Sequence, residues 1–153
     1  MNLAVGETVT FTGPMGFFVL DLQHPGDIVF AATGVGIAPV LPMLDEALGR
    51  NESGRIVLYW GNRYQRDLFW QRELDARINN PRLQVRRFLS SDDPTWTGER
   101  GRITSAIAAD LASLLQPTFY LVGNGGMIRD VKQELVARGV DRKRQIRNEV
   151  FFE

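Results

Sequence analysis

The sequence predicts an α/β protein with a doubly wound, five-stranded parallel sheet of the Rossmann-like type. Five short apolar runs alternate with amphipathic segments from residue 28 onward. Apolar strands separated by helices are typical of a parallel sheet that helices cover on both faces. The first run also ends in a glycine-containing turn just before a helix, as at the carboxyl edge of many such sheets.

The expected elements follow one another in a regular order. Strands are expected at residues 28–32, 56–60, 83–89, 118–122 and 145–151, and helices at residues 39–48, 66–78, 103–115 and 127–138. Gly139 is a plausible C-cap for the last helix. Ligands of such sheets bind outside the carboxyl ends of the strands. The site is therefore expected in the loops at 33–36, 61–63, 90–102 and 123–126.

The first 24 residues follow a different pattern. Residues 7–11 alternate like an antiparallel strand, and residues 12–16 form a turn signal. A single strand cannot form a domain. Residues 1–24 are therefore interpreted as a remnant or the edge of something larger plus a linker, and residues 25–153 as a dinucleotide-binding domain.

Length and composition fit one ordinary soluble domain. The chain has 153 residues, of which 44% are hydrophobic and 24% charged. Basic and acidic residues balance at 18 each, so nucleic acid is not an expected partner. No run of about 20 apolar residues and no signal-peptide pattern occurs, which predicts a cytoplasmic protein with no membrane span. With no cysteine and one histidine, neither an iron–sulfur cluster nor a metal site is expected in this chain.

The turn after the first strand has the features of a phosphate site. Gly34 and Gly36 allow a sharp turn, and Pro39 suits the start of a helix. The free N–H groups and positive dipole of a helix N-terminus attract phosphate. The spacing is not the G-x-G-x-x-G fingerprint, so a turn without a ligand remains an alternative.

Four segments, the first of which contains this turn, share a family pattern. They are AATGVGIAPVLPML, LYWGNRYQRDLFWQREL, FYLVGNGGMIRDVKQEL and the terminal QIRNEVFF. Together, in this order, they resemble the C-terminal NAD(P)-binding domain of ferredoxin–NADP reductase-type flavoenzymes, including oxygenase reductase components. GETVTFTGPMGFF resembles the last strand of that family's flavin-binding β-barrel and its linker. The resemblance covers nearly the whole chain.

The resemblance implies a function. The chain is expected to present the nicotinamide of NADH or NADPH for hydride transfer to FAD or FMN on a domain that it lacks. Electrons would pass onward to an iron–sulfur or haem partner. The flavin domain is expected in cis, in a longer protein from which this chain is excised, or in trans on a partner chain. The isolated chain should bind nucleotide without catalysing a reaction. The alternative is a non-enzymatic nucleotide-sensing or regulatory module that keeps the fold.

The first turn is expected to hold the pyrophosphate. Backbone N–H groups of Gly34, Gly36 and the helix that begins near Pro39 would bind it. Val35 departs from the family, which commonly has threonine there. One hydrogen bond on the nicotinamide side is therefore in doubt.

The second glycine turn is expected beside the nicotinamide and its ribose. Gly123, Asn124 and Gly125 form this turn by resemblance. Met127 would reach toward the adenosine side, with core packing as the alternative. Val122 stands where many relatives have a cysteine near the reacting carbon, which predicts slower hydride transfer with binding retained.

Three residues are expected near the reacting atoms. Thr33 could bond the nicotinamide amide or cap the next helix. Glu149 matches a near-terminal family glutamate that orients the nicotinamide or passes a proton, with a plain surface residue as the alternative. Phe151, or its neighbour Phe152, would cover the flavin ring or serve as an apolar anchor.

The ribose 2′-position decides between NADH and NADPH. The third strand ends in Ser90 and Ser91, followed by Asp92 and Asp93, where NADP-type relatives often have Ser-Arg. The two acids would repel a phosphate dianion, while serine and aspartate suit a free ribose hydroxyl, so NADH is favoured. Arginine is the best phosphate ligand, and two arginines stand on suitable loops. The cofactor-binding candidates from these loops are Gly61, Arg63, Ser90, Ser91 and Arg102.

Overall fold

The computed structural model describes residues 3–13, 15–21, 26–50 and 54–153. They form a three-layer α/β fold around a six-stranded parallel sheet, with strand order β4-β3-β2-β1-β5-β6. The strands are β1 Ile28–Thr33, β2 Ile56–Asn62, β3 Leu83–Leu89, β4 Glu99–Arg100, β5 Thr118–Asn124 and β6 Ile146–Phe152. The helices are α1 Ile37–Gly49, α2 Gln71–Asp75, α3 Ile103–Asp110 and α4 Gly125–Ala137, with short 3-10 turns at Gly34–Gly36, Gln65–Asp67 and Leu111–Ser113. The predicted α/β class is confirmed.

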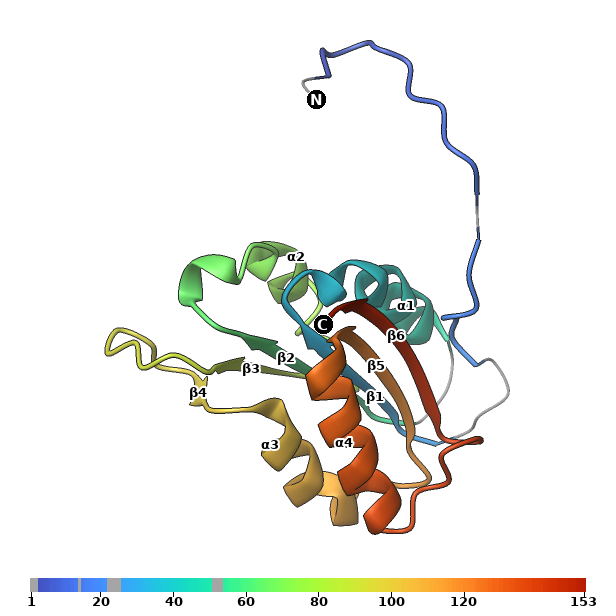
Figure 1. Ribbon diagram of the computed structural model, residues 1–153, viewed down its shortest axis with the longest axis vertical. Helices are drawn as coiled ribbons and strands as arrows, with labels where there is room; N and C mark the ends of the chain where they lie inside the picture. The colour runs from blue at the N-terminus through green and yellow to red at the C-terminus, as the bar shows by residue number, and fades with distance from the viewer. Residues whose placement is uncertain (1–2, 14, 22–25, 51–53) are drawn as a thin grey trace.

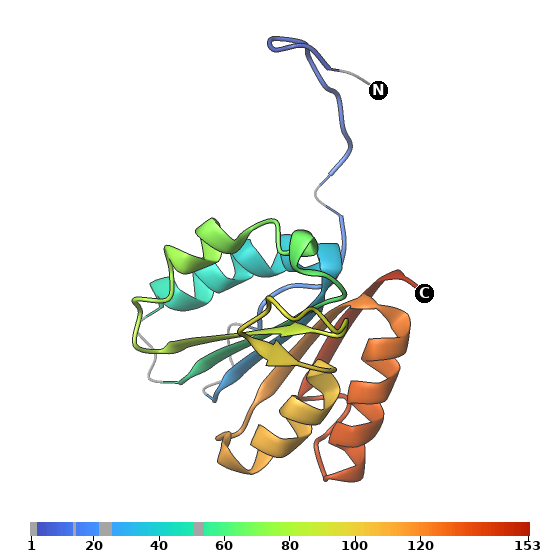
Figure 2. The same cartoon turned by 90° about the vertical axis from the view of Figure 1, so that its left-hand side faces the viewer.

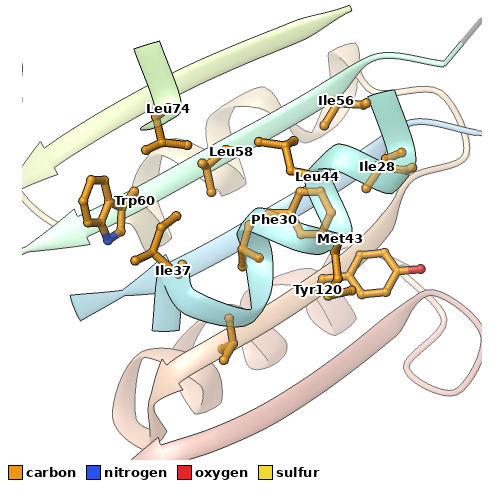
Figure 3. Close-up of a cluster of buried hydrophobic side chains, with 14 of the residues drawn as sticks. Ile28, Phe30, Ile37, Met43, Leu44, Ile56, Leu58, Trp60, Leu74 and Tyr120 are labelled. Carbon is orange, nitrogen blue, oxygen red and sulfur yellow. The ribbon is translucent and has the colours of Figure 1, made fainter. Parts of the chain in front are cut away.

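Helices cover both faces of the sheet, as Figures 1 and 2 show. Alternate strand residues point to opposite faces, so each face has its own core. Phe30 and Trp60 belong to the cluster under α1 and α2, and Figure 3 shows Trp60 beside this layer. Val29 and Tyr59 belong to the cluster under α3 and α4. All four side chains are fully buried, which fixes the register of the central strands.

The order in which strands are added to the sheet reverses between β1 and β5. From β1 the strands continue outward through β2 and β3, and the later strands are added on the other side of β1. Thr33 at the end of β1 lies opposite Gly61 in β2. Because the strand order reverses between β1 and β5, the loops that follow these two strands diverge there. Open α/β sheets bind ligands at such a topological switch point.

The sheet has one strand more than expected. The additional strand, β4, consists of two polar residues. They pair with Phe88 and Leu89 of β3 at the edge of the sheet. Two residues are too few for an alternating or apolar pattern, so the sequence gives no signal for it.

The single helix expected at residues 66–78 is wrong. The segment forms a 3-10 turn and the short helix α2. Leu68 and Trp70 both pack on the core cluster under α1 and α2. Residues two apart point to opposite sides of a helix, so one continuous helix could not bury both.

Residues 7–11 do not form the expected strand, and no strand in the described part of the chain pairs with them. Residues 17–21 behave differently. Phe18 lies edge-on to the Tyr120 ring at 6.1 Å, and Leu20 is buried in the core. The Asp21 N–H donates to the Tyr120 hydroxyl at 2.7 Å, and its carboxylate lies 3.2 Å from Arg147. The chain therefore joins the sheet domain at this segment (Figure 1).

The C-cap expected at Gly139 is confirmed. Its φ is +90°, and its N–H donates to the Val136 carbonyl at 3.0 Å. The Val140 N–H donates to the Leu135 carbonyl at 3.1 Å, which completes a Schellman motif. None of the helices in the described part of the chain is both long and apolar enough to cross a membrane.

Candidate functional site

A cleft of about 1050 Å³ lies along the carboxyl edge of the sheet. All four loops expected to form the site contribute to its wall. The lining residues are Thr33, Gly34, Val35, Gly61, Asn62, Arg63, Arg66, Asp67, Phe69, Ser90, Gly101, Arg102, Ile103, Thr104, Asn124, Gly126, Met127, Asp130, Phe152 and Glu153. The volume is large enough for a dinucleotide-sized ligand.

The turns after β1 and β5 are locked against each other. Thr33 Oγ1 accepts a hydrogen bond from the Asn124 N–H at 2.9 Å, and it does not cap the following helix. A Cβ on Gly123 would lie 2.4 Å from Thr33 Oγ1, and a Cβ on Gly36 would lie 2.6 Å from the Val122 carbonyl oxygen. Contact between the two turns thus accounts for glycine at positions 36 and 123.

The second turn leads into α4 through a side-chain cap. Asn124 Oδ1 accepts a hydrogen bond from the Met127 N–H at 3.0 Å. Met127 both lines the cleft and packs partly against the core. A Cβ on Gly125 would lie 2.9 Å from a carboxylate oxygen of Glu153. The start of α4 therefore faces the last residues of the chain across one end of the cleft.

Charges of both signs line the cleft in equal number. They are Arg63, Arg66, Arg102, Asp67, Asp130 and Glu153. Arg102 lies 3.1 Å from Asp130, and Arg66 lies 4.0 Å from Asp67. Arg63 lies over the Tyr64 ring at 5.2 Å, and within the described residues it forms no ion pair. Arg63 is therefore the cleft cation most available to a ligand.

The loop after β3 is held against the end of β2. The Ser90 N–H donates to the Asn62 carbonyl at 3.0 Å, and the Ser91 N–H donates to the Arg63 carbonyl at 3.1 Å. Ser90 lines the cleft, whereas Ser91 does not.

The acidic pair after Ser91 lies outside the cleft wall. The Asp92 side chain is fully exposed and lies 3.7 Å from Arg100. Hydrogen bonds from the hydroxyl and then the N–H of Thr95 lower the pKa of Asp93 below its ordinary value. Both carboxylates thus have roles outside the cleft, which weakens the sequence argument that they repel a phosphate within it.

Buried polar groups at this edge lack partners. Asn62 is only 6% exposed, yet neither its Oδ1 nor its Nδ2 has a hydrogen-bond partner among the described residues. The hydroxyl of Ser91 is also buried and unpaired. An unsatisfied buried polar group costs about 1–3 kcal/mol. Both groups lie at the edge of the sheet beside the cleft, with their polar atoms enclosed by the protein.

Several expected site residues lie away from the cleft wall. Val122 is fully buried in the core, and Pro39 lies in the first turn of α1. Glu149 is exposed on β6, opposite Val122 in the register. Phe151 does not line the cleft, whereas Phe152 does, and its ring would lie 3.7 Å from a Cβ on Gly34.

The sequence analysis missed other residues of the cleft wall. Asn62 lies between Gly61 and Arg63, which were both predicted as site residues. A polar residue on the same strand face as the apolar Trp60 was the signal that could have pointed to it. Arg66 and Phe69 were assigned to a continuous helix, which hid their position. The described residues contain no group of three or more His, Cys, Asp or Glu side chains that could hold a metal ion.

Comparison with known proteins gives a consistent family. The oxidoreductase NAD-binding domain family matches residues 30–133. The ferredoxin–NAD(P)(+) reductase component of naphthalene 1,2-dioxygenase/salicylate 5-hydroxylase systems from Ralstonia sp. is 34% identical over 90% of this chain and 42% of its own length. The CDP-6-deoxy-L-threo-D-glycero-4-hexulose-3-dehydrase reductase from Yersinia pestis is 29% identical over 91% of this chain and 42% of its own.

Solved structures agree with this comparison. The Amycolatopsis cytochrome P450 reductase GcoB has a TM-score of 0.78 and 27% identity, over 92% of this chain and 43% of its own. The chain thus spans less than half the length of these relatives. The match confirms the resemblance drawn from the sequence motifs. This chain belongs to the oxidoreductase NAD-binding domain family, as the nucleotide-binding part of ferredoxin–NADP reductase-type reductases.

Proposed function

We propose that the cleft binds NADH and presents its nicotinamide to a flavin held by a domain outside this chain. The observation that carries the proposal is the position of the cleft. It opens at the switch point between β1 and β5, between two interlocked glycine turns, in a chain of the NAD-binding family. Two turns that fix each other can hold a pyrophosphate between them without further ordering.

The residues of the cleft divide the work. Backbone N–H groups around Gly34 and the start of α4 bind the pyrophosphate. Thr33 and Asn124 hold the two turns at a fixed separation through their 2.9 Å hydrogen bond. Phe152 shields the glycine turn from water until the nicotinamide displaces it. The chain thereby orients the nicotinamide, and orientation is its contribution to the rate.

A flavin held on that domain would supply the redox chemistry, namely hydride acceptance and single-electron release. The matched relatives are named as reductases of oxygenase and cytochrome P450 systems. We therefore propose FAD on a neighbouring domain and an iron–sulfur or haem acceptor. Since the flavin is proposed on another domain, we expect this chain alone to bind nucleotide and to catalyse no turnover.

NADH is the proposed cofactor in preference to NADPH. A 2′-phosphate needs a cationic fork, and arginine provides it best. Of the cleft arginines, Arg102 is paired with Asp130 and Arg66 lies near Asp67. Among the described residues of the cleft wall, Arg63 is the arginine without an ion pair, and the wall has no net formal charge. A free ribose hydroxyl suits this balance better.

Calorimetric titration of the chain with NADH, NADPH and S-adenosylmethionine tests the proposal. We expect NADH to bind more tightly than NADPH, and S-adenosylmethionine not to bind. Binding of neither nicotinamide would contradict the proposed function, and tighter NADPH binding would contradict the cofactor preference. NADH oxidation by the chain with added free FAD would contradict the assignment of the flavin to another domain.

A further inference from the structure

A carboxylate of the chain itself lies at one end of the cleft. Glu153 lines the cleft, and its carboxylate oxygens lie 2.9 and 3.1 Å from the position of a Cβ on Gly125, at the start of α4. One of these oxygens also accepts a hydrogen bond from the Arg129 guanidinium at 3.0 Å. The first turn of a helix carries a partial positive charge, which stabilises a carboxylate beside it. The Glu153 carboxylate therefore lies where the proposed function places a phosphate.

An irregularity in β6 brings Glu153 to this position. Between the partners of Gly123 and Asn124, the register advances by two residues on β6, so Phe151 is an extra residue there. A β-bulge of this kind changes the direction of the side chains that follow it. Phe152 and Glu153 both line the cleft, whereas Phe151 does not. The strand itself thus directs the carboxylate into the cleft.

Glu153 differs from the other acids of the cleft wall. Asp67 and Asp130 each lie beside an arginine of the wall. Arg129, the partner of Glu153, does not line the cleft. The side chains of Glu153 and Arg129 are 75% and 70% exposed. Because an exposed ion pair contributes little to stability, a ligand can separate this pair at low cost.

We propose that Glu153 is a specificity-determining residue that competes with the phosphate groups of the nucleotide for the start of α4. A phosphate that takes this place displaces the carboxylate from Arg129. The displaced carboxylate stays near the cleft and repels anions, so its effect grows with the negative charge of the ligand. NAD+ carries one positive charge more than NADH, so Glu153 penalises NADH more than NAD+. The inference rests on the proposed function, because it concerns the regulation of that same site.

Calorimetric titration of Glu153→Gln and the unmodified chain with NADH and NAD+ tests the proposal. Glutamine keeps the size of the side chain and removes its charge. We expect NADH to bind the variant about 5-fold more tightly, the effect of one nearby charge in a well-hydrated site. The gain for NAD+ should be smaller. NADH affinity should also depend more steeply on salt in the variant, because its cleft wall has a net positive formal charge.

Two further variants separate charge from structure. Glu134→Gln is the matched control, because Glu134 also lies on the surface, pairs with an arginine of α4 at 3.1 Å and does not line the cleft. It makes the same change in net charge and should leave both nucleotide affinities unchanged. Glu153→Asp shortens the side chain but keeps its charge, so most of the penalty on NADH should remain. Melting temperatures should stay close to that of the unmodified chain, because each substitution affects an exposed pair.

The outcomes separate the inference from the function on which it rests. Equal or weaker NADH binding by Glu153→Gln would overturn the inference, as would equal gains for NADH and NAD+. A gain of the same size in Glu134→Gln would assign the effect to the net charge of the chain and also overturn it. A full gain in Glu153→Asp would assign the effect to the length of the side chain, with the same consequence. Failure of NADH to bind both the unmodified chain and Glu153→Gln would instead contradict the proposed function.

Discussion

The amino edge of the sheet contains Asp27, which is 2% exposed, and the carboxyl edge contains Asn62, which is 6% exposed. The Asp27 carboxylate accepts hydrogen bonds from the Arg55 N–H at 2.8 Å, the Arg55 guanidinium at 2.9 Å and the Leu115 N–H at 2.9 Å. The Asn62 side chain has no such bond within the described residues. Two buried polar side chains at opposite edges of one sheet thus differ in whether other described residues complete their hydrogen bonds.

The difference separates stability from function. At the amino edge the protein completes its own hydrogen bonds, so that edge holds the fold together. At the carboxyl edge, one cleft is lined by Asn62, by a half-exposed aromatic ring and by Arg63; among the described residues the Asn62 amide has no hydrogen-bond partner and Arg63 no ion pair. Substitutions at the first edge should change the free energy of unfolding, and substitutions at the second should change nucleotide affinity.

The largest expected effect is at Asp27. Asp27→Ala removes the buried acceptor of three hydrogen bonds and leaves the backbone N–H groups of Arg55 and Leu115 without it. We expect a loss of about 3 kcal/mol in the free energy of unfolding, measured by urea denaturation. NADH affinity of the folded protein should not change.

Asp45→Ala is the control for this substitution. It breaks the exposed pair between Asp45 and Arg77, which lowers the pKa of Asp45 mainly through a side-chain hydrogen bond. Exposed pairs contribute about 0–1 kcal/mol, so its effect should be small. Equal losses for both variants would contradict the structural role of the amino edge.

The next effect is at the contact between the glycine turns. Gly123→Ala places a Cβ 2.4 Å from Thr33 Oγ1 at a φ of +122°. We expect a loss of about 2–3 kcal/mol in unfolding free energy together with weaker NADH binding. This residue is the exception that couples the two properties, because it positions both walls of the cleft.

Gly139→Ala isolates the contribution of the contact itself. Gly139 also has positive φ, at +90°, but no atom lies within 4 Å of an added Cβ. Its loss should be about 1 kcal/mol, with NADH binding unchanged. If the two alanine variants behaved alike, the lock between the turns would not exist.

These contacts show what the sequence could and could not predict. The order of strands and helices, the cap at Gly139 and the loops of the cleft followed from apolar periodicity and glycine positions. The lock between Thr33 and Gly123 joins residues 90 apart in the chain, and no local pattern reports such a contact. The broken helix near Leu68 was set by tertiary burial, which overrides helical spacing.

The candidate site was predicted at the level of loops rather than side chains. Arg63 and Ser90, both proposed from their loops, line the same cleft because strand ends in a parallel sheet meet at one edge. Asn62 was passed over, because whether a polar side chain has a partner depends on all of its surroundings. Glu149 was chosen by family pattern alone, and the structure leaves it exposed outside the cleft wall.

A smaller effect is expected at Tyr59, under α3. Burial, and then the 2.6 Å hydrogen bond to Asp110, raise the pKa of Tyr59 above its ordinary value of 10.0. Above that pH the unfolded chain releases the proton while the folded chain keeps it, so stability falls as pH rises. Tyr59→Phe should cost about 1 kcal/mol at neutral pH and reduce this alkaline loss.

Thermal unfolding measured from about pH 9 to about pH 11 gives the slope of stability against pH. This range brackets the ordinary pKa of tyrosine. Some slope should remain in the variant, because burial also raises the pKa of Tyr120. An unchanged slope in Tyr59→Phe would show that Tyr59 titrates alike in both states. NADH affinity at neutral pH should be unaffected, since Tyr59 does not line the cleft.

The smallest effect is expected at the cleft arginines. Arg63→Ala should lower NADPH affinity several-fold while changing NADH affinity little, because Arg63 has no ion pair among the described residues. Arg102→Ala also frees Asp130 and should change NADPH affinity less. Calorimetry with both nucleotides compares the variants. A larger effect at Arg102 would move the 2′-site to the α3 side of the cleft.

The most direct test of the account is an NMR titration of the ¹⁵N-labelled chain with NADH. We predict that amide resonances of Gly34, Asn62 and Gly126 at the carboxyl edge shift, and that those of Asp27 and Leu115 do not. This result would place the ligand in the cleft. It would also show that the amino edge does not contact the ligand, as expected for an edge that stabilises the fold. Shifts confined to the amino edge, or no shifts at saturating NADH, would contradict the division of the sheet into a structural edge and a binding edge.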